Sequence, residues 1–126
     1  MQKVTIETSL GKVTGIEEND VWMFKGIPYA VTERFELPKP YPKWDEFDAT
    51  DTEIDCYQYL TYRDESKGQD AFYHKEFRSD REFKFAESPM TMNIITKKNA
   101  KNHPVLVFIH GGGFETGTVG ELPYGT

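Results

Sequence analysis

The chain has 126 residues, of which 37% are hydrophobic and 29% charged, so it fits one small domain or part of a larger one. Its net charge of −6 argues against a nucleic-acid or anionic-membrane partner, because phosphate binding needs clustered Lys and Arg. The longest apolar run, residues 105–109, is far shorter than the roughly 20 residues of a membrane span, and the first residues show no secretory signal. We therefore expect no membrane partner and a cytoplasmic location.

The first 27 residues predict an antiparallel meander of three strands. Residues 3–8 alternate apolar and polar side chains, which is typical of a half-buried strand. A turn at Gly11 leads to a second strand over residues 12–17, in which Gly15 is expected to mark a bulge. After the turn EEND, a third strand is predicted over residues 21–27.

Residues 28–88 break this pattern and predict a long irregular connection. Prolines forbid regular strand pairing in its first part; they are Pro28, Pro38, Pro40 and Pro42. Aromatic side chains are expected to hold that part on a surface; they are Tyr29, Phe35, Tyr41 and Trp44. The rest is polar and weakly periodic, with a short helix expected over residues 70–77. A connection of this length is usually functional or belongs to a larger body.

Two further strands are predicted near the end of the chain, over residues 91–98 and 105–110. The second contains the continuous apolar run VLVFI, without alternation. Such a run predicts burial on both faces, as in the interior of a mixed or parallel sheet with helices on each side.

The sequence HGGGF, residues 110–114, follows this run directly. Consecutive glycines suit a backbone with positive φ, or one that a ligand must approach closely. After a buried strand their N–H groups would lie where ligands bind in open α/β sheets, and two such groups can stabilise an oxyanion. No Lys-Ser or Lys-Thr follows, as a P-loop requires, and the spacing of Gly111, Gly113 and Gly117 does not match the dinucleotide fingerprint G-x-G-x-x-G. A flexible turn stays open as the alternative.

Several segments, found in the same order along the chain, resemble the N-terminal portion of the type-B carboxylesterase family, which includes the cholinesterases. They are FKGIPYA (24–30), ERF (33–35), the spaced Pro40 and Trp44, DAT (48–50), CYQ (56–58), MNII (92–95) and VLVFIHGGGFETG (105–117). The resemblance implies an α/β class and the N-terminal part of an α/β-hydrolase fold: an antiparallel meander, a long irregular connection, then the first strands of the mixed central sheet. Residues 1–126 would be the N-terminal portion of one domain, with the remainder of that domain outside this chain.

By the same resemblance, the complete protein would hydrolyse carboxylic esters with a Ser-His-acid triad and no cofactor or metal. Gly112 and Gly113 would supply two oxyanion-hole N–H groups, and Gly111, His110 and Phe114 would shape the loop and the edge of the acyl pocket. The expected partners are a small-molecule ester and the remainder of the same polypeptide.

The cysteine pattern departs from the family. Members often pair the cysteine of the C-x-Q segment with one just before the MNII strand, where this chain has Pro89. Cys56 therefore lacks that partner, which fits an intracellular, bacterial version of the family. Nothing near Cys56 in the sequence would lower the pKa of its thiol, so we expect a buried structural thiol and not a nucleophile.

No nucleophile, acid or base for ester hydrolysis is expected within this chain. The serines are Ser9, Ser66, Ser79 and Ser88, and the histidines are His74, His103 and His110. None of the serines lies in G-x-S-x-G, and the catalytic histidine comes late in the family order. The chain alone should be inactive. Two alternatives remain: a non-catalytic esterase-like binding protein, and an inactive truncated fragment.

Overall fold

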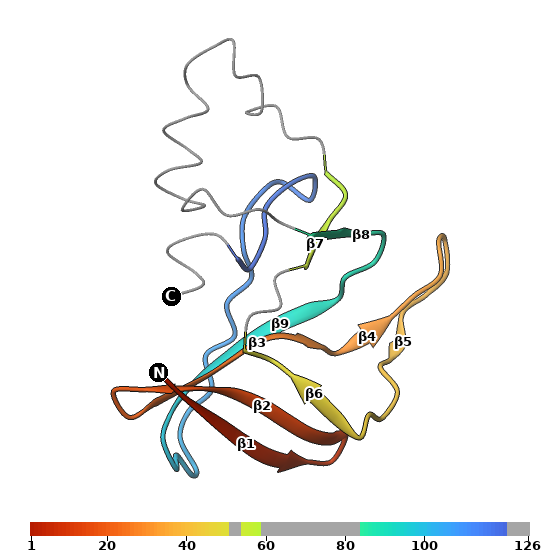
Figure 1. Ribbon diagram of the computed structural model, residues 1–126. Helices are drawn as coiled ribbons and strands as arrows, with labels where there is room; N and C mark the ends of the chain where they lie inside the picture. The colour runs from red at the N-terminus through yellow and green to blue at the C-terminus, as the bar shows by residue number, and fades with distance from the viewer. Residues whose placement is uncertain (51–53, 59–83, 121–126) are drawn as a thin grey trace.

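The computed structural model describes residues 1–50, 54–58 and 84–120, which form strands and loops (Figure 1). The largest unit is a five-stranded sheet with the order β1-β2-β3-β9, in which β6 also pairs with β2. These strands are β1 (Gln2–Thr8), β2 (Gly11–Glu18), β3 (Val21–Pro28), β6 (Glu46–Asp48) and β9 (Thr91–Lys97). The pairing of β6 with β2 is parallel, and the other pairs are antiparallel. The predicted meander and the predicted strand before residue 98 are both confirmed.

The core of this sheet forms where β2 and β3 diverge. It consists of Val13, Phe24, Ile27 and Ala49, all buried. The backbone of Ala49 joins the two strands, because its N–H donates to the carbonyl of Thr14 at 2.7 Å and its carbonyl accepts the N–H of Lys25 at 2.8 Å. Where β2 and β3 no longer pair with each other, the residue that follows β6 thus supplies hydrogen-bond partners for the backbone groups of both strands.

Gly15 does not form the predicted bulge. The pairing of β1 with β2 runs without a register shift from Gln2 to Thr8, with Val4 opposite Gly15. A side chain at Gly15 would instead meet the ring of Phe24, whose Cδ1 lies 2.5 Å from the position of a Cβ. The glycine is required by this close approach, which is the other reason for glycine within a strand. The irregularity lies between Phe24 and Ile27, where the register of β3 and β9 shifts and Gly26 has a φ of 67°.

The connection after β3 is irregular, as predicted, with two small paired units. β4 (Ala30–Val31) pairs with β5 (Lys39–Pro40), and β7 (Ile54–Cys56) pairs in parallel with β8 (Lys84–Ala86). The predicted helix over residues 70–77 lies outside the described residues.

Of the four aromatic residues expected to hold this connection, Trp44 does so most directly. Its indole N–H donates to the carbonyl of Lys12 at 3.0 Å, and its ring centroid lies 5.5 Å from that of Phe47 and 5.9 Å from that of Tyr41. The expectation is wrong for Phe35, which is 96% exposed, and Tyr29 is also exposed.

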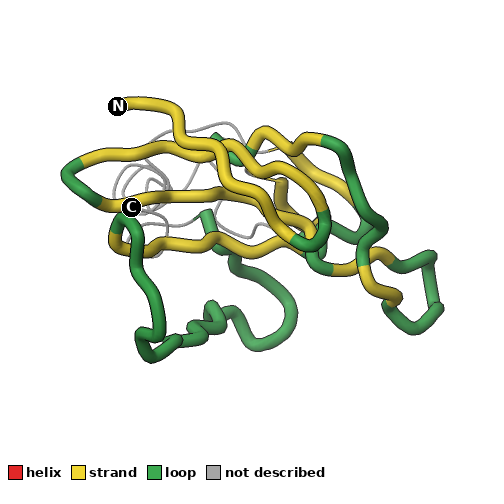
Figure 2. The backbone as a smooth tube through the Cα atoms, turned by 90° about the horizontal axis from the view of Figure 1, so that it is seen from below, coloured by secondary structure: helices red, strands yellow, loops and turns green. Residues whose placement is uncertain are grey.

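The predicted buried strand over residues 105–110 is not formed. The side chains of residues 105–109 are 61% to 91% exposed, and Figure 2 shows this part of the chain as loop. A strand that is apolar on both faces needs a paired neighbour at its edges and a cover on each face. Among the described strands none pairs with this run, and β9 pairs with β3 alone. The prediction failed because an apolar run favours burial but does not itself provide the neighbouring strands and covering helices that burial requires.

Candidate active site

The glycine loop closes on the carbonyl group of Gly112. This oxygen accepts the N–H groups of Glu115 and Thr116, both at 3.1 Å, and the hydroxyl of Thr116 at 3.3 Å. The closure requires positive φ angles of 128° at Gly112 and 62° at Gly113. A Cβ at Gly112 would lie 1.8 Å from the carbonyl oxygen of Thr116, so only glycine fits there. The loop is therefore a hydrogen-bonded turn of defined geometry.

His110 and Phe114 lie at the two ends of the glycines. Nδ1 of His110 lies 2.8 Å from the carbonyl oxygen of Gly111, to which it donates in the Nδ1–H tautomer. Phe114 has a φ of 63° and a fully exposed side chain. A positive φ is unusual for a non-glycine residue, so the backbone turn at Phe114 is set by the closure of the loop.

The residues that follow the loop are held by polar side chains from two other segments. The amide of Gln58 binds Gly117 twice: the N–H of Gly117 donates to Oε1 at 2.9 Å, and Nε2 donates to the carbonyl of Gly117 at 3.3 Å. The hydroxyl of Thr118 donates to a carboxylate oxygen of Asp55, which is only 2% exposed. This explains why residues 110–120 lie beside β7 in Figure 1.

Asn93 on β9 provides the third attachment. Its Nδ2 donates to the carbonyl of Val119 at 3.3 Å, while its Oδ1 accepts the N–H of Gly26 at 2.9 Å. One amide thus connects the register shift in β3 with the chain that follows the loop. Gly117, Thr118 and Val119 are consecutive, and each is bound by a different side chain.

Sequence reasoning assigned no role to Asp55, Gln58 or Asn93. Gln58 and Asn93 nevertheless lie in the CYQ and MNII segments that carried the resemblance. The resemblance therefore pointed to the segments that hold the loop, but not to these residues. Of the predicted site residues, the structure brings residues 110–114 together in one loop. It does not place them after a paired strand, because residues 105–109 form none.

Other candidate features contribute nothing to this site. The described serines and histidines other than His110 are Ser9, Ser88 and His103; Ser66, Ser79 and His74 lie outside the described residues. The part of the chain that the structure describes holds no cluster of His, Cys, Asp and Glu able to bind a metal. It also contains no helix long and apolar enough to cross a membrane.

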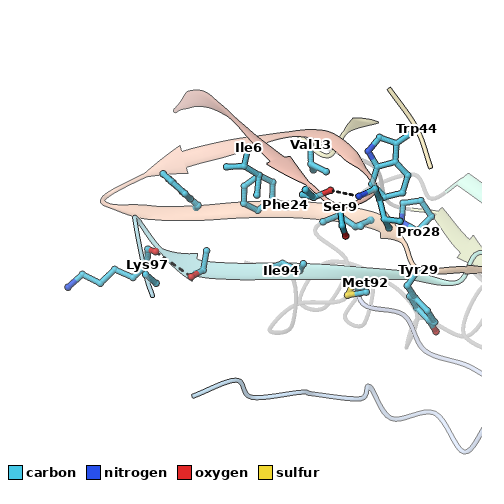
Figure 3. A pocket seen from close by; sticks show the side chains of 16 residues that line it. Ile6, Ser9, Val13, Phe24, Pro28, Tyr29, Trp44, Met92, Ile94 and Lys97 are labelled. Atoms are coloured by element: carbon cyan, nitrogen blue, oxygen red, sulfur yellow. Dashed lines mark hydrogen bonds between the residues drawn. The ribbon is translucent and has the colours of Figure 1, made fainter. Parts of the chain in front are cut away.

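An apolar hollow of about 450 Å³ lies on one face of the sheet (Figure 3). Its walls include Ile6, Val13, Phe24, Trp44 and Ile94, which come from the meander, from β9 and from the segment after β5. None of residues 110–120 lines it. Because its lining is mostly apolar and includes none of the loop residues, we assign it to packing and not to catalysis.

Cys56 is exposed, which corrects the expectation of a buried thiol. The expectation that it is not a nucleophile is supported by its surroundings. Partial desolvation of the thiol, and then the negative charge of the neighbouring Asp55, raise the pKa of Cys56 above its ordinary value. Since the thiolate is the reactive form, this environment makes the sulfur less nucleophilic at neutral pH.

We expect the substitution Cys56→Ser to leave kcat for ester hydrolysis by the complete protein within about twofold of wild type, because a protonated thiol takes no part in the reaction. The measurement is hydrolysis of a short-chain nitrophenyl ester by Cys56→Ser and by wild type. Wild type is measured both before and after treatment with iodoacetamide at pH 7. A loss of most activity in Cys56→Ser, or a protein protected from alkylation by substrate, would show that the sulfur does act in the site.

Comparisons with known proteins bear on nearly the whole chain. Residues 2–125 match the model of the carboxylesterase family. The chain is 34% identical over 127 residues to Gut esterase 1 of Caenorhabditis elegans, covering 94% of this chain and 19% of that protein. It is also 34% identical over 130 residues to the para-nitrobenzyl esterase of Bacillus subtilis (strain 168), covering 94% of this chain and 23% of that protein.

Solved structures agree with these relatives. A thermophilic PNB esterase superposes with a TM-score of 0.71 at 31% identity, over 95% of this chain and 24% of that chain. The juvenile hormone esterase of Manduca sexta superposes with a TM-score of 0.67 at 28% identity, over 92% of this chain and 22% of that chain. The chain therefore spans about a fifth to a quarter of the length of the proteins that it matches.

Proposed function

The chain belongs to the carboxylesterase family, and from this premise we propose that the complete protein hydrolyses carboxylic esters through a serine acyl-enzyme. Residues 1–126 would be the N-terminal portion of one α/β-hydrolase domain, whose remainder carries the serine, the acid and the histidine in that chain order. The fold of the described part, with its antiparallel strands, agrees with the N-terminal part of the solved esterases.

In the proposed mechanism the serine attacks the ester carbonyl while the histidine takes its proton and the acid orients the histidine. The carbonyl oxygen then carries a negative charge, which the N–H groups of Gly112 and Gly113 would stabilise together with one beside the serine. Collapse of this tetrahedral intermediate expels the alcohol and leaves an acyl-enzyme. Water then attacks the acyl-enzyme by the same steps and releases the acid. The reaction uses no metal and no organic cofactor.

The observation that best supports this role is the geometry at Gly112. Its φ of 128° and the 1.8 Å approach of the Thr116 oxygen to a Cβ at this position exclude every other residue. A backbone that is turned in this way, closed by hydrogen bonds and held through Gly117, is preorganised. Preorganised N–H donors are what oxyanion stabilisation requires. Gly111, His110 and Phe114 would shape the loop and the edge of the acyl pocket.

The test is hydrolysis of a short-chain nitrophenyl ester by the complete protein. We expect turnover with a burst of nitrophenol equal to the enzyme concentration whenever deacylation limits the rate, because an acyl-enzyme accumulates. A matched control replaces the serine of the downstream G-x-S-x-G motif by alanine, and the 126-residue chain alone should be inactive. A complete protein without turnover, and without that motif after Thr126, would be a non-catalytic binding protein and would refute the proposal.

A further inference from the structure

We propose that Gln58 is a positioning residue for ester hydrolysis: it holds Gly117 against the peptide that joins Gly111 to Gly112, and so fixes the direction of the Gly112 N–H. This inference rests on the proposed function, because it concerns the same oxyanion site. Gln58 follows β7 and is far from the glycines in the sequence, and the proposal adds it to the groups on which the reaction depends.

The first step of the argument is the double contact of one amide with one residue. Oε1 of Gln58 accepts the N–H of Gly117 at 2.9 Å, and Nε2 donates to its carbonyl at 3.3 Å. The two contacts act on the peptide planes before and after the Cα of Gly117. Neither plane can rotate without breaking one of them, so the residue is fixed in orientation as well as in position. Gly117 itself has a φ of 99°, which favours glycine.

The second step is the contact between Gly117 and the base of the glycine loop. A Cβ at Gly117 would lie 2.2 Å from the carbonyl oxygen of Gly111 and 2.7 Å from Nδ1 of His110. The backbone of Gly117 therefore lies directly against that oxygen. Nδ1 of His110, at 2.8 Å, contacts the same oxygen. The Gly111 carbonyl is thus confined by Gly117 and by the histidine.

The third step is the planarity of the peptide bond. The carbonyl of Gly111 and the N–H of Gly112 belong to one planar trans peptide, so they point in opposite directions. Confining the oxygen at one end of this peptide confines the N–H at its other end. If the Gly111 oxygen were free to rotate, the Gly112 N–H would sample directions in which it cannot reach a developing oxyanion. Gln58 prevents this through Gly117.

The neighbouring attachments make the proposal testable. Thr118 is bound to Asp55, and Val119 to Asn93, independently of Gln58. Replacing Gln58 leaves both in place, so the loop should stay attached and the protein should fold. The expected defect is one of orientation at a single peptide and not the loss of the whole segment.

The experiment compares Gln58→Met with wild type in the complete protein. Methionine keeps the length and approximate volume of glutamine but offers neither strong donor nor acceptor. We expect kcat for a nitrophenyl ester to fall about 10- to 100-fold, with KM within about threefold, because the oxyanion exists only in the transition state. Affinity for an alkyl boronic acid, whose tetrahedral serine adduct places an oxygen at the oxyanion position, should fall by a similar factor.

The matched control is Thr5→Val, which removes the 2.8 Å hydrogen bond between the hydroxyls of Thr5 and Thr14 in the sheet. It should lower the melting temperature without changing kcat. If Gln58→Met lowers the melting temperature but keeps the wild-type kcat and boronic-acid affinity, Gln58 is only structural and the inference is overturned, while wild-type turnover still supports the proposed function. A wild-type protein without turnover would overturn both.

Discussion

The substitution Gly112→Ala in the complete protein is expected to lower kcat for ester hydrolysis by about 100- to 1,000-fold, the loss typical of one oxyanion-hole donor. An added Cβ would lie 1.8 Å from the carbonyl oxygen of Thr116, at a φ of 128°. The chain can relieve this overlap only by turning the peptide planes beside residue 112. The measurement is steady-state hydrolysis of a nitrophenyl ester, with circular dichroism to show that the variant is folded.

Gly111→Ala serves as the comparison for this substitution. A Cβ at Gly111 would have no neighbour within 4 Å, and its φ is not among the positive ones. We therefore expect a much smaller loss of kcat, although both glycines are adjacent in the same loop. Equal losses in the two variants would contradict the role of the Gly112 conformation and would point to a general need for glycine in this segment.

The substitution Gly15→Ala is expected to destabilise the complete protein by about 3 kcal/mol, at the upper end of the cost of overpacking a core. A Cβ there would lie 2.4 Å from the carbonyl oxygen of Met23 and 2.5 Å from Cδ1 of Phe24. Phe24 belongs to the buried core and is only 2% exposed, so displacing its ring would disturb that core. The measurement is the free energy of unfolding from urea titration, with the slope checked against wild type.

A double-mutant cycle with Phe24→Leu separates the two contacts of this added methyl group. Leucine removes the ring edge that the methyl group would meet but leaves the backbone oxygen of Met23. The cost of Gly15→Ala should therefore be smaller, yet not zero, in the Phe24→Leu background. Strict additivity of the two substitutions would show that the ring is not what excludes a side chain at Gly15.

The strands of the meander could be predicted from the sequence, because alternation of apolar and polar side chains is a property of neighbouring residues. The role of Gly15 could not. A glycine in a strand indicates either a bulge or a close approach, and the neighbour that decides between them, Phe24, lies on another strand. The register shift occurs instead beside Gly26, whose N–H donates to Oδ1 of Asn93 on β9.

The apolar run over residues 105–109 shows the same limit in another form. Its apolar composition predicts a strand buried on both faces, because such side chains favour burial. Whether they are buried depends on strands and helices that pair with and cover them. None of the described strands pairs with the run, and it is exposed loop.

For the site, the loop could be predicted from the local sequence. Three consecutive glycines after a histidine predict positive φ, which Gly112 and Gly113 adopt. The resemblance of this segment to the carboxylesterase loop agrees with the family to which the chain belongs. The side chains that hold this loop are known only from the folded structure. The contacts of Gln58, Asp55 and Asn93 join residues 59, 63 and 26 positions apart. The tolerance of glycine for positive φ is a property of the residue itself and can be read locally. Hydrogen bonds across such separations depend on how the whole chain is folded, and no local pattern encodes them.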